Sequence, residues 1–202
     1  CLKQGAYKNR LFFVEGNSHT ANYIPMLNKV NLKPGDSIYY EHNSEILSNS
    51  TTERLNNLKK AYNEIVFVTN IENYNLNKLE YIKNKLENDI RILLLSTVPN
   101  LSSDNKPLKC FIRGTDCIYY KIDDFNNRNL INYFSIIKNF VNRNKKRVLF
   151  YNSYDVICSS NECYSYRVAK DKLSHRDKSH LTIEGSLSLE KDFLNFYSKH
   201  FN

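Results

Sequence analysis

The chain has 202 residues, of which 41% are hydrophobic and 13% aromatic, and its formal net charge is +8. This length and apolar content are typical of one globular domain with a real core, and they exclude a disordered chain. No apolar run approaches the roughly 20 residues that a membrane-spanning helix needs. The chain begins with Cys1 and shows no signal peptide. We therefore expect a single domain, residues 1–202, that is either excised from a larger protein or a processed form.

The positive charge alone invites a nucleic-acid interpretation. However, the basic residues are scattered along the chain, and the one cluster, residues 143–147, is best explained as a solvated turn between a helix and a strand. We therefore expect no nucleic-acid partner. A basic surface also suits anionic glycans or a membrane face.

Short apolar runs alternate with helical patterns along the chain. The runs predict strands, and the spacing of apolar residues between them predicts helices. This alternation is typical of an α/β fold with a central parallel five-stranded sheet, covered by helices on both sides. In chain order, the predicted elements are strand 10–15, helix 21–29, strand 37–42, helix 51–62, strand 64–69, helix 76–87, strand 90–96, helix 129–142, strand 147–151 and helix 184–198.

The first strand leads directly into Gly16-Asn17-Ser18-His19. Ligands of parallel sheets bind beyond the carboxyl ends of the strands, which is where Ser18 would lie. A serine that opens a helix can act as a nucleophile whose own backbone N–H helps to hold an oxyanion. It can equally be an ordinary helix N-cap.

Asparagines at the end of the third strand are candidate donors to that oxyanion. Asn70 ends the strand and is the preferred side chain, and Asn73 is its near rival. Since the chain is rich in asparagine, either residue could also be an ordinary turn residue.

Two pairs of cysteines are close in sequence: Cys110 with Cys117, and Cys158 with Cys163. No histidine or cysteine stands at zinc-site spacing around them, so we expect local disulfides and an oxidising, extracytoplasmic setting. Free buried thiols are the alternative, and Cys1 is left over.

The long segment 152–178 leads into Asp177-Lys178-Ser179-His180-Leu181. With Ser18, this motif supplies the three residue types of nucleophilic acyl chemistry: His180 as general base and Asp177 as the carboxylate that orients it. His175 is a competing base, with Asp171 or Asp177 as its partner.

These two motifs resemble those of a known family. Gly16-Asn17-Ser18-His19 is similar to the Gly-Asp-Ser-His block of SGNH hydrolases and acyltransferases, with Asn17 in place of the aspartate. Residues 177–185 are similar to their terminal Asp-x-x-His-Leu-Ser-x-x-Gly block. Residues 158–177, and Thr97-Val98-Pro99, resemble one subgroup: the SGNH domain at the carboxyl end of bacterial membrane-bound acyltransferase-3 proteins.

The resemblance implies a three-layer α/β/α flavodoxin-like fold, with Ser18, Asp177 and His180 as catalytic triad. It implies O-acetylation of a bacterial surface glycan, such as O-antigen, at the periplasmic or extracellular face of a membrane. Neither a metal nor a cofactor would be bound. A covalently linked transmembrane domain would supply acetyl groups that come from acetyl-CoA. The glycine that donates to the oxyanion in the family has no counterpart in residues 41–49, and Gly35 lies on the wrong side of the second strand. Ser44 or its backbone is one candidate substitute, and an incomplete oxyanion hole is the alternative.

Two further functions remain open on the sequence. One is an esterase with the same triad, acting on carbohydrate or lipid with water as the acceptor. The other is a non-catalytic glycan-binding domain that keeps the SGNH-like fold.

Overall fold

The structure is a computed structural model, and the chain divides into two compact units that interleave along the sequence. The first unit comprises Cys1–Ala21, Asn31–Leu95 and Ser135–Phe150, and the second comprises Asn22–Val30, Ser96–Phe134 and Tyr151–Asn202. The residues that the structure describes are 9–30, 33–43, 46–70, 76–99, 119–121, 124–159, 162–164, 174–177 and 179–201.

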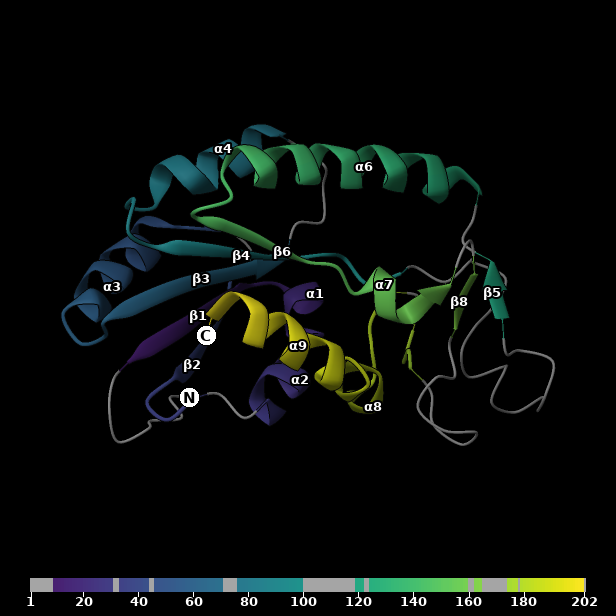
Figure 1. Ribbon diagram of the computed structural model, residues 1–202, viewed down its shortest axis with the longest axis horizontal. Coiled ribbons are helices and arrows are strands. Elements are labelled where there is room, and N and C mark those ends of the chain that lie inside the picture. Colours follow the sequence, from purple (N-terminus) through teal and green to yellow (C-terminus); the bar gives the residue numbers. More distant parts are fainter. Residues whose placement is uncertain are drawn as a thin grey trace. The chain divides into compact units, whose positions relative to one another are not determined.

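The first unit is built on a five-stranded parallel sheet (Figure 1). Its strands lie in the order β2-β1-β3-β4-β6. The strand β2 is added on one side of β1 and the later strands on the other side, as in flavodoxin-like sheets. The prediction of an α/β fold with a central five-stranded parallel sheet is confirmed. The strands are β1 (Arg10–Gly16), β2 (Ser37–His42), β3 (Glu64–Asn70), β4 (Arg91–Leu95) and β6 (Val148–Tyr151), whose last residue belongs to the second unit.

The central strands have long apolar runs, as expected of strands that are buried on both faces. Leu11, Phe12, Phe13 and Val14 of β1 are all at most 1% exposed. Phe13 stacks on Phe67 of β3, with ring centroids 6.3 Å apart. Such runs form locally and pack into one core, which is why they could be located from the sequence.

The helices of the first unit are α1 (Ser18–Ala21), α3 (Asn49–Lys59), α4 (Leu76–Lys85) and the second half of α6 (Asp124–Arg143). Ser48 caps α3, since its side chain accepts from the N–H of Thr51. Lys83 of α4 lies 5.9 Å from the centroid of the Phe140 ring of α6. Figure 1 shows α4 and this part of α6 on the same side of the sheet.

The second unit contains α2 (Ile24–Lys29), α7 (Tyr154–Ile157), α8 (Ile183–Leu187) and α9 (Glu190–Phe201), and also a small sheet in the order β5-β8-β7. This antiparallel sheet consists of β5 (Tyr119–Lys121), β7 (Cys158–Ser159) and β8 (Glu162–Tyr164), and it was not predicted. Its strands are two or three residues long, too short for a period-2 pattern to be recognised.

Two predicted helices differ in their bounds from the structure. The pattern over 21–29 begins at the last residue of α1 and covers α2, and Pro25 in the first turn of α2 marks the new helix start. The pattern over 184–198 contains α8 and α9, with the break at Ser188 and Leu189. Apolar periodicity continues across such breaks, so it does not locate them.

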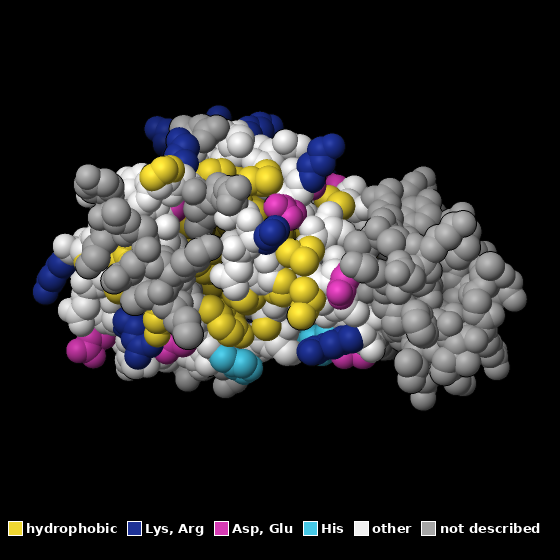
Figure 2. Space-filling model, turned by 90° about the horizontal axis from the view of Figure 1, so that it is seen from below, with side chains coloured by type: hydrophobic (Ala, Val, Ile, Leu, Met, Phe, Trp, Pro, Cys, Tyr) yellow, Lys and Arg dark blue, Asp and Glu magenta, His cyan; other side chains and the backbone are white. Residues whose placement is uncertain are grey.

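On the face shown in Figure 2, Lys and Arg side chains are scattered instead of forming one basic patch. Within the part of the chain that the structure describes, no helix is both long and apolar enough to cross a bilayer.

Candidate functional site

The turn between β1 and α1 places Ser18 at the carboxyl end of the first strand. Gly16 has a φ of 154°, and a Cβ on this residue would lie 2.0 Å from Oγ1 of Thr20. Glycine is therefore needed both for the backbone conformation and for the close approach of α1 to the strand.

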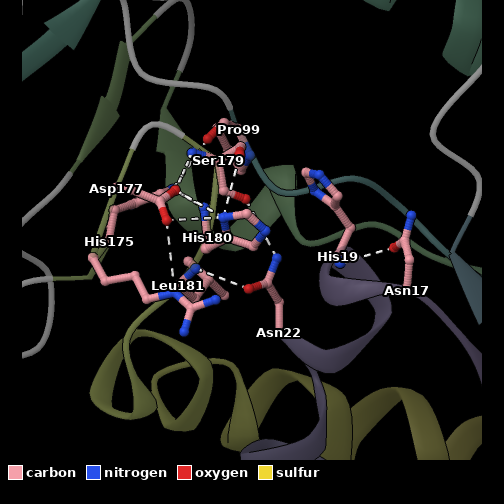
Figure 3. Close-up of polar contacts among 10 residues, drawn as sticks. Asn17, His19, Asn22, Pro99, His175, Asp177, Ser179, His180 and Leu181 are labelled. Carbon is pink, nitrogen blue, oxygen red and sulfur yellow. Dashed lines mark hydrogen bonds and ion pairs between the residues drawn. The ribbon is translucent and has the colours of Figure 1, made fainter. Parts of the chain in front are cut away.

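Asn17 caps α1, because its Oδ1 accepts a hydrogen bond of 2.9 Å from the N–H of His19 (Figure 3). Ser18 is the first residue of the helix, so the alternative of Ser18 as the N-cap is wrong. The side chains of asparagine and aspartate both provide this acceptor oxygen, so the helix is still capped although Asn17 replaces the aspartate of the family motif. The helix α1 has only four residues, so its dipole is small. This turn can therefore stabilise an oxyanion mainly through its backbone N–H groups.

Asn70 is the last residue of β3, the neighbour of β1 in the sheet. Its side chain is buried, and Nδ2 donates a hydrogen bond of 3.3 Å to the carbonyl of Leu95, its partner in β4. Ser18 and Asn70 thus both belong to the carboxyl edge of the sheet in the first unit. Asn73 and Ser44, the other candidate donors, lie outside the described residues.

A buried carboxylate, Glu15, holds the segment that follows β2. Its oxygens accept from the hydroxyl of Thr51 at 2.6 Å, the N–H of Leu47 at 2.8 Å and the side-chain amide of Asn43 at 3.1 Å. Leu47 has a φ of 57°, which is uncommon for leucine. The N–H of Asn43 also donates to the carbonyl of Gly16 at 3.0 Å. The segment that lacks the expected glycine is therefore tied to the turn that carries Ser18.

Sequence analysis missed the role of Glu15. The available signal was a charged residue at the end of an otherwise apolar strand, Leu11-Phe12-Phe13-Val14-Glu15.

The second unit brings Asp177 and His180 together (Figure 3). Both carboxylate oxygens of Asp177 lie 2.9 Å from Nδ1 of His180. Oδ1 also accepts from the backbone N–H groups of Ser179 and His180, at 2.9 Å each. Partial burial acts to raise the pKa of Asp177, but these hydrogen bonds outweigh it and hold the pKa below its usual value. The carboxylate is therefore charged at neutral pH, and its contact with Nδ1 leaves Nε2 as the ring nitrogen for proton transfer.

His175, the competing base, is fully buried. Its Nδ1 lies 2.9 Å from the hydroxyl of Ser174 and its Nε2 lies 3.1 Å from the carbonyl of Pro99. Burial lowers its pKa to about 4. Both ring nitrogens are engaged in structural hydrogen bonds, so the geometry favours His180 over His175 as the base. Asp171 lies outside the described residues.

The loop of His180 is fastened to α8. The side chain of Thr182 caps this helix by accepting from the N–H of Gly185 at 2.9 Å, and the N–H of Thr182 donates to the carbonyl of Ser174. A Cβ on Gly185 would lie 2.0 Å from that same carbonyl oxygen. Gly185 therefore allows the helix to lie directly against the chain that leads to the Asp177–His180 pair.

The described residues bear on one of the two predicted disulfides, the one between Cys158 and Cys163. Cys158 is disulfide-bonded, and Cys163 stands directly opposite it in the β7–β8 ladder. Cys110, Cys117 and Cys1 lie outside the described residues. Among the residues that are described, no group of three or more His, Cys, Asp or Glu side chains could hold a metal ion.

The predicted site residues are thus distributed over both units: Ser18 and Asn70 in the first, Asp177 and His180 in the second. Within each unit the arrangement suits acyl transfer, with a serine at the carboxyl edge of the sheet in one and a histidine oriented by a carboxylate in the other.

Comparisons with known proteins identify the family and the fold of this chain. The model of the SGNH domain that is fused to AT3 domains matches residues 1–195. The periplasmic domain of a lipopolysaccharide acetyltransferase from Salmonella ser. Paratyphi A has a similar structure: 16% of the sequence is identical, 96% of this chain and 85% of that chain are covered, and the TM-score is 0.64. At this identity the similarity concerns the fold.

A catalytic mutant of Axe2, an acetylxylan esterase from Geobacillus stearothermophilus, is a more distant structural match, with 12% identity, 94% coverage of both chains and a TM-score of 0.47. A search of curated protein sequences found no match. Since the family model covers nearly the whole chain, the protein belongs to the SGNH family of serine-hydrolase-type domains, in the group that is fused to AT3 domains.

Proposed function

We propose that this domain is an extracytoplasmic O-acetyltransferase, which transfers an acetyl group through an acyl-Ser18 intermediate to a hydroxyl of a bacterial surface glycan such as O-antigen. The observation that carries the proposal is the contact of Asp177 with Nδ1 of His180 in a chain whose Ser18 follows a parallel strand. Membership of the AT3-fused group and the similarity in fold to the periplasmic domain of a lipopolysaccharide acetyltransferase support it.

In the first half-reaction, Oγ of Ser18 attacks the carbonyl carbon of the acetyl donor, and Nε2 of His180 takes the hydroxyl proton. Asp177 keeps the imidazole in the tautomer with its proton on Nδ1 and stabilises the imidazolium that forms. The backbone N–H of Ser18 and the amide of Asn70 donate to the oxyanion. The bond to the leaving group breaks, and His180 returns the proton to that group.

In the second half-reaction, a glycan hydroxyl loses its proton to His180 and attacks acetyl-Ser18, which releases the acetylated glycan and restores the serine. A linked membrane AT3 domain would supply acetyl groups derived from acetyl-CoA, and no cofactor would be bound to this domain. The disulfide-bonded Cys158 fits an extracytoplasmic setting. We also propose that Cys163 is its partner and that Cys110 pairs with Cys117.

An esterase that uses the same residues is the second candidate. The side chain of Asp177 is 49% exposed and that of His180 is 20% exposed, so water has access to this pair. If water replaces the glycan hydroxyl in the second half-reaction, the enzyme removes acetyl groups instead of transferring them.

Active-site labelling tests the shared mechanism. We expect a fluorophosphonate to add once to the wild-type protein, as measured by intact mass, and not to Ser18→Ala. Absence of the adduct on folded wild-type protein would reject the triad and favour a non-catalytic glycan-binding domain.

Turnover of a small acetyl ester, with and without candidate surface polysaccharides, separates the two enzymatic functions. A transferase deposits acetyl groups on the polysaccharide at the expense of free acetate. An esterase releases acetate at the same rate whether or not the polysaccharide is present.

A further inference from the structure

The buried side chain of Asn22 contacts the backbone on both sides of His180 (Figure 3). Its Oδ1 accepts a hydrogen bond of 3.0 Å from the N–H of Leu181. Its Nδ2 lies 3.4 Å from the carbonyl of Ser179, a longer and weaker contact. One carboxamide therefore binds the chain immediately before and immediately after the proposed base.

The contacts of Asn22 add to other hydrogen bonds that hold the backbone of residues 179–181. The N–H of His180 donates to Oδ1 of Asp177, and its carbonyl accepts from the N–H of Arg176, at 2.9 Å each. Those two partners come from the same loop. Asn22 is separated from Ser179 and Leu181 by 157 and 159 positions in the chain, so it fastens the loop to a different segment.

We propose that Asn22 is a positioning residue, which sets the direction of the His180 imidazole by holding the Ser179 and Leu181 backbone. This inference rests on the proposed role of His180 as the base. Without the Asn22 contacts, the loop keeps its internal hydrogen bonds and its contacts with α8 but loses its attachment at Ser179 and Leu181. A small displacement of a catalytic group can lower a rate by a factor of about 100.

The place of Asn22 in the sequence adds to the argument. It is four positions beyond Ser18, on the chain that leaves α1. The same short segment of sequence thus carries both the proposed nucleophile and the residue that holds the loop of the proposed base.

The test compares Asn22→Ala with Ser186→Ala. The hydroxyl of Ser186 accepts a hydrogen bond of 3.2 Å from the N–H of Met26, so it joins α2 to α8 without contacting His180. We expect Asn22→Ala to slow fluorophosphonate labelling of Ser18 by about 10- to 100-fold, and Ser186→Ala to leave it within about 3-fold of the wild-type rate, with thermal stability recorded for both. Asn22→Asp keeps the acceptor for the Leu181 N–H and should recover much of the loss.

A second readout is independent of Ser18. The proton NMR signal of the His180 Nδ1–H, shared with Asp177, should be sharp and at low field in the wild type and in Ser186→Ala, and broadened by exchange in Asn22→Ala. Wild-type labelling rates and an unchanged Nδ1–H signal in Asn22→Ala would overturn the inference. Equal loss in both alanine variants would also overturn it, because the effect would then be structural. If the wild type itself is not labelled, the proposed function fails, while the NMR signal still tests the positioning.

Discussion

At the scale of single residues, two carboxylates decide how the parts of the site are held. Asp177 accepts three hydrogen bonds from one short loop, including the one that orients His180. Glu15 is buried completely and holds the segment after β2. The role that we propose for Asp177 is catalytic, whereas the contacts of Glu15 are structural, so substitution of the carboxylate by an amide should have different effects at the two positions.

Asp177→Asn should reduce acetyl-ester turnover by about 10⁴-fold, because an amide can hold the imidazole in the wrong tautomer and no longer stabilises its charged form. Initial rates at saturating ester measure this. The matched control is Asp155→Asn, an exposed aspartate that contacts Asn152 and should retain the wild-type rate. A loss of less than 10-fold in Asp177→Asn would remove this residue from the triad.

Glu15→Gln should lower the free energy of unfolding by about 2 to 3 kcal/mol, because an amide NH₂ replaces an oxygen that faces buried donors. Denaturant titration measures the change. Glu53→Gln changes an exposed glutamate in α3 and should stay within about 0.5 kcal/mol of the wild type. Equal stability of the two variants would show that the Glu15 contacts contribute little.

At the scale of elements, the site depends on close backbone packing at two glycines. Gly16 brings α1 against β1, and Gly185 brings α8 against Ser174. In both places a side chain would meet atoms of the opposing segment at 2.0 Å. Glycine is required at both positions by these close approaches and not by a preference for helix or strand.

Gly185→Ala should lower the melting temperature by about 5 to 10 °C, because the atom opposite is a backbone carbonyl that cannot rotate away. It should also reduce ester turnover, since α8 adjoins the loop of His180. Ile183→Ala, at a position 64% exposed in the same helix, is the control for both measurements. A Gly185→Ala protein as stable and active as this control would contradict the packing argument.

At the scale of the whole molecule, the buried His175 makes stability depend on pH. Its pKa is about 4 in the folded protein, below the ordinary value of 6.5, because burial disfavours the charged form. Between these two values the unfolded chain binds more protons than the folded one, so stability falls as the pH is lowered from 6.5 to 4. The part due to His175 amounts to about 3 kcal/mol.

Denaturant titrations from pH 7 to pH 4 measure this dependence. His175→Gln should show a smaller loss of stability over this range than the wild type. His42→Gln alters an exposed histidine and should follow the wild-type curve. Identical pH curves for His175→Gln and the wild type would show that His175 is not what couples stability to pH.

The sequence by itself determined the parallel sheet and the residues of the two motifs. Apolar strands such as β1 and β3 and the turn Gly16-Asn17-Ser18 are local patterns whose structure follows from nearby residues. The pairing of Asp177 with His180 is also local, since three positions separate them. The strands, the turn and the Asp177–His180 pair could be predicted because residues close in sequence decide them. The parallel sheet could be predicted because strands alternate with helices along the chain.

Only the tertiary structure decided which polar side chains hold the site. Many asparagines are present, and nothing in the pattern distinguishes Asn22, whose partners are 157 and 159 positions away. The preference for His180 over His175 as the base rests on the burial of His175 and on its contact with the carbonyl of Pro99, 76 positions away. A buried polar group needs a partner, but the sequence does not tell which one the fold brings to it, because that depends on how distant segments pack.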